Sequence, residues 1–207
     1  MKTFWSASIA IMLCSGEAAA QIGTGQSGIS TSTPVSNARP FKELQSFGTC
    51  LARTARNAAL AVVATAPGSR EEGKVLKKFV FGERTTCLFG GTQMQMPAIF
   101  ARGAIAEGLL LSGGVPAEYR LPAPAPSEVR DLHGAARCYA SRHRGDVQKL
   151  LQTDPGTPQE VKAVAAIWDE FRTCMPNFKV RLNAPWIRYL LAEALLRVES
   201  STTASGR

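Results

Sequence analysis

Six charged side chains recur at matching places in two parts of the chain, and they are its strongest candidates for chemistry. The glutamates among them could serve as a general acid or base if a cleft raised their pKa values. The arginines could hold an anion through charge-assisted hydrogen bonds. The same side chains could also form ion pairs between helices, a role for which arginine is favoured, and the arginines could instead cap backbone carbonyls. The six positions are Arg56, Arg102, Glu107, Arg144, Arg188 and Glu193.

The spacing of these charges excludes partners on their own helix. Arg102 and Glu107 are five residues apart, which is about 140° around a helix, and Arg188 and Glu193 have the same spacing. We therefore predict ion pairs between helices, and these are Arg56 with Glu107 and Arg144 with Glu193. The alternative is a basic cleft between the two repeats, lined by Arg102 and Arg188, that holds an anion.

Other catalytic chemistry has little support in the sequence. The two histidines, His133 and His143, have no counterparts in the first repeat, and we expect both on helix surfaces. A nucleophile would need a base held beside it, and no local pattern provides that arrangement. There is no glycine-rich phosphate loop after a strand and no cluster with metal-ligand spacing. We therefore assign no catalytic, cofactor-binding or metal-binding residue.

The first twenty residues are typical of a secretory signal. Lys2 precedes a short apolar core, Phe4 to Leu13, and small residues before Gln21 predict cleavage after Ala20. The alternative is a lipoprotein acylated at Cys14, which the bulky Leu13 disfavours. No later stretch is long enough to cross a bilayer. The sequence therefore predicts export to the periplasm or the extracellular space.

Four cysteines remain after cleavage, and an even number in an oxidising compartment favours disulfides. None forms the close C-x-x-C pair of a zinc site. If the chain is a duplication, each copy should close its own bridge. We therefore predict the bridges Cys50–Cys87 and Cys138–Cys174.

The chain reads as a tandem duplication joined by a linker. Matches such as Cys50 with Cys138, Glu72 with Glu160 and Glu107 with Glu193 follow one another at nearly constant offsets. A Gly/Ser-rich stretch precedes the first matched block, and a Pro-rich stretch separates the two blocks. The predicted organisation is a signal peptide (1–20), a disordered leader (21–40), the first repeat (41–113), a Pro-rich linker (114–127), the second repeat (128–199) and a tail (200–207).

Each repeat is expected to contain three helical segments, which makes the fold all-α. The first is interrupted, with Asn57 or Asp146 capping a restart. The second opens on a capping box, Ser69 to Glu72 or Thr157 to Glu160. The third is amphipathic in the second repeat, with an apolar stripe from Ile187 to Val198. Apolar alternation at Met94 and Met96 and at Val180 and Leu182 suggests a short two-stranded β-ribbon.

These blocks resemble a family of uncharacterised exported bacterial proteins. Its pattern is a Cys near a following Arg, a Pro-Gly-Ser turn, a second Cys, and a helix close to Arg-Gly-x-Leu-Ala-Glu. The stretch from Arg102 to Glu107 is near that helix motif, whereas the stretch from Arg188 to Glu193 departs from it at the glycine. The resemblance implies export and a helical fold, and it brings no activity or catalytic residue.

Composition adds limits on partners. The net charge is +8 at pH 7, but Lys and Arg are spread along the chain without interleaved aromatics, so no specific nucleic-acid signal is present. We interpret the basic charge first as a soluble surface; the partner is unknown, and an acidic envelope component or another exported protein are the candidates. Two functions remain: a non-enzymatic helical module of the cell envelope, and a hydrolase of an envelope polymer with Glu107 or Glu193 as acid or base. The lack of a catalytic constellation favours the module.

Overall fold

The computed structural model describes residues 28–29, 38–80, 87, 96–175 and 180–198. The predicted signal peptide, most of the leader, and the tail from Ser200 lie outside these residues. Eight α-helices account for most of the described part, so the predicted all-α class is confirmed. They are α1 (Arg39–Thr54), α2 (Arg56–Ala64), α3 (Arg70–Val75), α4 (Ala98–Leu111), α5 (Leu132–Arg142), α6 (Arg144–Leu151), α7 (Pro158–Thr173) and α8 (Ala184–Val198).

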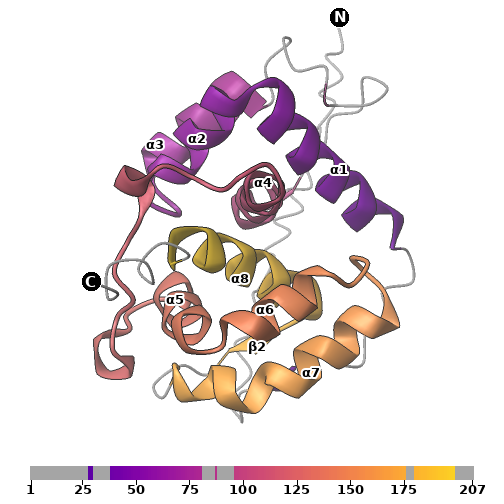
Figure 1. Ribbon diagram of the computed structural model, residues 1–207, viewed down its shortest axis with the longest axis vertical. Helices are drawn as coiled ribbons and strands as arrows, with labels where there is room; N and C mark the ends of the chain where they lie inside the picture. Colours follow the sequence, from indigo (N-terminus) through magenta and orange to yellow (C-terminus); the bar gives the residue numbers. More distant parts are fainter. Residues whose placement is uncertain (1–27, 30–37, 81–86, 88–95, 176–179, 199–207) are drawn as a thin grey trace, which may run out of the picture.

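The helices form two halves with α4 and α8 at the centre. Helices α1 and α2 lie against α4 on one side, with α3 beside α2, and α5 to α7 lie against α8 on the other (Figure 1). We call α1–α4 the N-terminal half and α5–α8 the C-terminal half. Residues 112–131 connect them and contain two short 3-10 turns, Ala117–Tyr119 and Pro126–Glu128.

Each half has four helices rather than the three predicted. The first predicted segment is divided into two separate helices, by Ala55 in one half and His143 in the other. Asn57 and Asp146 lie within the helices that follow, so the prediction that they cap a restart is wrong. Ala55 and His143 occupy the cap positions without a side-chain hydrogen bond. The interruption therefore does not depend on an Asx cap.

Helices α4 and α8 are buried around most of their circumference. Every residue from Ile187 to Val198 is buried, as is every residue from Ala101 to Leu109. The apolar stripe predicted for α8 is therefore only part of its buried surface, which also includes Arg188 and Glu193. A helix enclosed on all sides is the core of its fold.

The crossing of α4 over α8 requires a glycine. A Cβ atom at Gly103 would lie 2.2 Å from the Cβ of Tyr189, so the backbones approach too closely for a larger residue. Beside this contact Phe100 of α4 packs edge-to-face on Trp186 of α8, with ring centroids 5.4 Å apart. The sequence position matching Gly103 is Tyr189 itself. One half supplies the small residue and the other the side chain that covers it.

The short strands differ from the predicted ribbon. β2 (Arg181–Leu182) lies within the predicted segment, but its partner is β1 (Gly28–Ile29), in parallel register. Gly28 and Ile29 belong to the leader, residues 21–40, which we expected to be disordered. Met94 lies outside the described residues, and Met96 is not in a strand.

Both predicted disulfides are present. Cys50 is bonded to Cys87 and Cys138 to Cys174, with sequence separations of 37 and 36 residues. Each bridge closes within one half. The pairing expected from the repeated order of the cysteines is therefore confirmed.

Candidate functional site

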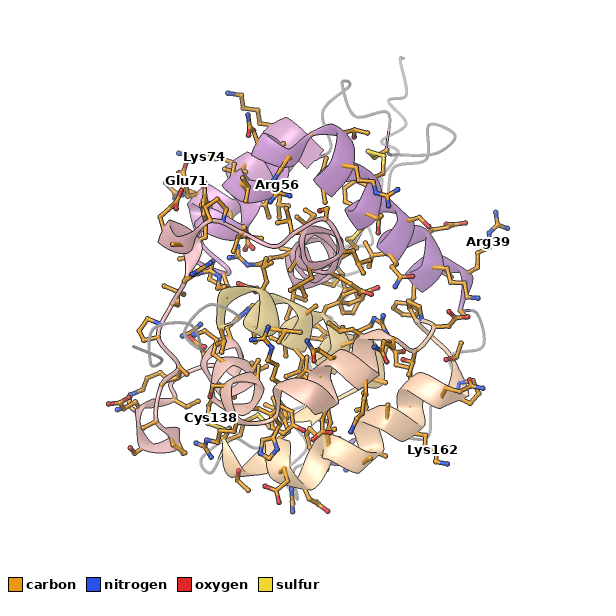
Figure 2. The ribbon with its side chains drawn as sticks, in the orientation of Figure 1. Arg39, Arg56, Glu71, Lys74, Cys138 and Lys162 are labelled. Atoms are coloured by element: carbon orange, nitrogen blue, oxygen red, sulfur yellow. A yellow bond between two sulfur atoms is a disulfide. The ribbon has the colours of Figure 1, made fainter. Side chains whose placement is uncertain are left out.

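The centre of the molecule holds two buried arginines, one on each central helix. Arg102 of α4 and Arg188 of α8 are 1% and 0% exposed. Their charged neighbours are also buried, which makes this the densest set of buried charges among the described residues. Figure 2 shows, by contrast, Arg39, Lys74 and Lys162 extending outward from the peripheral helices.

Arg102 caps the C-terminal end of α2. Its Nη1 donates to the carbonyl of Val62 at 2.8 Å, and its Nη2 donates to the carbonyls of Val63 at 3.0 Å and Thr65 at 2.8 Å. These carbonyls lie at the end of α2 and carry the negative end of its dipole, and that of Val62 also accepts the N–H of Thr65. A cation at this position satisfies the carbonyls and is stabilised by them.

Arg188 makes the corresponding contacts at the end of α6. Nη1 donates to the carbonyls of Leu150 at 3.2 Å and Thr153 at 3.0 Å, and Nη2 to the carbonyl of Leu151 at 3.0 Å. Each acceptor lies 88 positions after its counterpart around Arg102. The two guanidinium groups are therefore held in the same way by different parts of the chain.

The glutamates of the two capping boxes bind the same arginines. Ser69 and Thr157 accept the N–H of Glu72 and Glu160, as the sequence predicts. Each glutamate returns its bond to the glycine before the cap rather than to the cap itself: Oε2 of Glu72 accepts from Gly68, and Oε2 of Glu160 from Gly156. Both glycines have φ of +73°, a left-handed conformation that favours glycine.

The remaining oxygen of each capping glutamate faces an arginine. Oε1 of Glu72 lies 3.1 Å from Nη1 of Arg102, and Oε1 of Glu160 lies 3.4 Å from Nη1 of Arg188. The start of one helix, the end of another and a central arginine are thereby joined in each half. The capping boxes were predicted as local features of a helix start, and their glutamates also connect that start to the buried arginines.

The two halves are joined by ion pairs that cross between α4 and α8. Nε of Arg102 lies 2.8 Å from Oε1 of Glu193, and Nη2 of Arg188 lies 2.6 Å from Oε1 of Glu107. Arg188 also donates from Nε to Oε2 of Glu107 at 3.1 Å, which makes this pair bidentate. Each arginine thus binds a capping glutamate of its own half and a glutamate of the opposite central helix.

The predicted pairs Arg56–Glu107 and Arg144–Glu193 are wrong, because both carboxylates are bound by arginines of the central helices. Arg56 instead donates to the carbonyls of Ser112 and Gly114 just after α4. Arg144 is the first residue of α6. The alternative of a basic cleft lined by Arg102 and Arg188 does not fit either, since both are buried with carboxylates and carbonyls around them.

Burial and pairing set the ionisation of these groups. Burial alone would raise the pKa of Glu193, but the hydrogen bond from His133 and the charge of Arg102 lower it to about 2. Burial would lower the pKa of Arg188, yet the hydrogen bond and charge of Glu107 raise it. Glu160 differs, because burial raises its pKa against the Gly156 N–H and the Arg188 charge. Glu193 is therefore ionised and Arg188 protonated at neutral pH.

Besides the capping glutamates Glu72 and Glu160, three further residues of this network were not predicted as members of it. Gln45 of α1 donates to Oε1 of Glu107 at 2.6 Å, and Nδ1 of His133 lies 2.9 Å from Oε2 of Glu193. Arg197 places Nε 3.2 Å from Oε1 of Glu193 and donates to the carbonyls of Val63 and Thr65. His133 was expected on the surface and is partly buried. His133 aligns with Gln45 at the offset that relates Cys138 to Cys50, and this match could have indicated its place in the network.

This geometry is poorly suited to acid–base catalysis. A general acid must carry a proton near neutral pH, and Glu193 has a pKa near 2. A general base needs access to substrate, and Glu107 and Glu193 are 2% and 3% exposed. Within the described part of the chain, no group of three metal-ligating side chains lies close enough to hold an ion. No described helix is long and apolar enough to span a membrane.

Comparisons with protein-family models, curated proteins and solved structures found no match. The resemblance inferred from the sequence motifs stays a prediction.

Proposed function

We propose that the protein is an exported, non-enzymatic helical module with a binding or structural role in the cell envelope. The observation that carries this proposal is the pairing of Glu193 with Arg102. The sequence left this glutamate as a candidate acid or base of an envelope hydrolase. A buried carboxylate held ionised by an arginine of another helix serves to join helices.

The duplication supports this role. Two copies of one four-helix unit, each with its own disulfide, would place equivalent arginines and glutamates on the two central helices. Crossed pairs then form because each unit offers the other both members of the pair. In this proposal the repeat exists to build a rigid two-unit body, and the polar residues that recur are those that fix how the units meet.

Export is supported by the bridges and by the predicted signal. Two disulfides within a chain of this size are consistent with an oxidising compartment. The cleavage site after Ala20 would release a mature chain that starts at Gln21. An acidic envelope component or another exported protein is the partner that the basic surface favours.

The test separates the module from a hydrolase by comparing turnover and stability in one variant. Purified oxidised protein is incubated with cell-wall polymer, soluble products are followed by mass spectrometry, and unfolding is followed by circular dichroism. We expect no products from the wild type, and a lower melting temperature for Glu193→Gln. Products released by the wild type and lost in a fully stable Glu193→Gln would show the hydrolase instead.

A further inference from the structure

The two disulfides differ in how far solvent reaches them. Of the four cysteines that the structure describes, only Cys50 is partly exposed. The exposed fractions of Cys87, Cys138 and Cys174 are 2%, 0% and 1%. Cys138 and Cys174 lie in one hydrophobic core cluster, together with Phe171. The bridge of the N-terminal half can therefore be approached at one of its cysteines, whereas the bridge of the C-terminal half is enclosed at both.

Thr54 lies beside the accessible bridge. It comes one helical turn after Cys50 on α1, and its side chain is exposed. Its Oγ1 is 3.3 Å from Sγ of Cys87 and 3.9 Å from Sγ of Cys50. In the oxidised protein the hydroxyl donates to the carbonyl of Cys50 at 2.9 Å. A thiolate at Cys87 would offer the same hydroxyl a charged acceptor, and hydrogen bonds to charged groups are the stronger ones.

The C-terminal half has a different side chain at this position. Arg142 follows Cys138 by the same four residues, and its Nη2 is 3.1 Å from Sγ of Cys138. A guanidinium group favours a thiolate beside it, so Cys138 would be a good leaving group. A thiol would then have to attack Cys174, which is buried at the end of α7. Access to the attacked cysteine, and not the neighbouring charge, thus separates the two bridges.

We propose that the Cys50–Cys87 bridge is a site of thiol–disulfide exchange with small thiols in the folded protein, and that Cys138–Cys174 stays closed. The thiolate of the small molecule attacks Sγ of Cys50 and forms a mixed disulfide, and Cys87 leaves as a thiolate beside Thr54. A second thiolate attacks the small molecule's sulfur and releases Cys50. Both cysteines take up protons. Two small thiols are thereby oxidised to one disulfide, and the bridge is reduced to two thiols.

This inference goes beyond the proposed module role and can fail without affecting it, because the turnover test uses the oxidised protein. A positive result would give the module a modification site in one half alone. The sequence separations within the two bridges, 37 and 36 residues, are almost equal, so loop length provides no reason for unequal reduction. A difference in rate therefore reports on access.

Timed reduction of the oxidised full chain provides the test. Dithiothreitol is the probe for rates and reduced glutathione the probe for the mixed disulfide. Excess N-ethylmaleimide stops each sample, and peptides are mapped by mass spectrometry. We expect Cys50–Cys87 to open at least about tenfold faster than Cys138–Cys174, with glutathione attached to Cys50 and not to Cys87. In urea that unfolds the chain, the two rates should become similar, because access is then equal.

Thr54→Val and Thr54→Ser are the matched pair of variants. Valine has the same shape without the hydroxyl, and serine keeps the hydroxyl. We expect Cys50–Cys87 to open at least about threefold more slowly in Thr54→Val, because the leaving thiolate loses a hydrogen-bond donor. Thr54→Ser should react at the wild-type rate. Equal rates in the two variants would overturn the part assigned to Thr54.

Arg142→Gln is the control in the other half, since it removes the guanidinium beside Cys138 and leaves the burial of that bridge in place. Its Cys138–Cys174 bridge should open as slowly as in the wild type. The proposal is overturned if both bridges of the folded wild type open at one rate, or if glutathione is found first on Cys138 or Cys174. A difference in rate that persists in urea would overturn it too, because access would not be its cause.

Discussion

The two halves hold the same buried arginine in the same way, but they surround it with different neighbours. Around Glu107 the extra donor is the neutral Gln45, whereas around Glu193 it is His133, joined by Arg197. The position that matches Arg197 is Leu111, which is 69% exposed. The shared part fixes how the halves meet. The different part gives the Glu193 cluster a second arginine, whereas around Glu107 one arginine faces two glutamates, so the two sites should respond differently to the same substitution.

The largest expected effect is the loss of Arg188. Arg188→Met would leave Glu107 and Glu160 buried without a cation, which costs about 3–5 kcal/mol of unfolding free energy. Arg102→Met should cost at least about 1 kcal/mol less, because Arg197 still contacts Glu193 and the end of α2. Urea unfolding of the oxidised chain measures both. A larger loss for Arg102→Met would contradict the difference between the clusters.

The two disulfides should contribute equally, since their loops differ by one residue in length. Each loop of this size stabilises by roughly 3–4 kcal/mol in the chain-entropy model. Replacing both cysteines of a pair by alanine, one pair at a time, gives two variants for thermal unfolding. Similar losses would confine the difference between the halves to the charged clusters. A much smaller loss for one pair would show that the halves also differ in how they fold.

The unfolding free energy should fall in acid as Glu193 is protonated and loses its ion pair with Arg102. Its pKa is about 2 in the folded chain and ordinarily 4.5, so ionised Glu193 stabilises the fold above pH 4.5. That contribution, roughly 3 kcal/mol, is lost as pH falls from 4.5 to 2. In Glu193→Gln the fall across this window should be smaller by about that amount. Unfolding free energies measured at several pH values test it, and parallel curves for variant and wild type would refute the assignment.

The smallest expected effect is the exchange of the neutral donor for the histidine. His133→Gln copies the N-terminal half, where Gln45 donates to Glu107 at 2.6 Å. Because a donor to Glu193 is kept, the unfolding free energy should change by less than about 1 kcal/mol. His133→Ala removes the donor and should cost more. If the two variants are equally destabilised, the side chain at this position does not act as a donor to Glu193.

Local and repeated features of the fold could be predicted from the sequence, and the partners across the core could not. The disulfides followed from the repeated order of the cysteines, and the capping boxes from Ser69 and Thr157. The spacing of Arg102 and Glu107 excluded a partner on the same helix, but it did not say which helix supplies one. That choice depends on how α4 crosses α8, which is set by the contact of Gly103 with Tyr189.

The sequence predicted most residues of the candidate site but not how they pair. Arg102, Glu107, Arg188 and Glu193 were all singled out because they recur, and all four are in the network. Arg197 was missed because its counterpart is an apolar residue, so repetition gave no signal. The repeat pattern identifies what the two halves share, and the residues that distinguish them become visible only once the helices are packed.

A double-mutant cycle on Glu107 tests the central claim, that crossed ion pairs join the halves. Unfolding free energies are measured for Glu107→Gln, for Arg188→Met and for the double variant. We expect a coupling of about 1–3 kcal/mol, as found for residues in direct contact. The same cycle with Arg56→Met is the control, because among the described residues Arg56 donates to carbonyls after α4, and it should be additive within about 0.5 kcal/mol. Additive effects for Arg188 together with coupling for Arg56 would contradict the account and restore the pairing within each half.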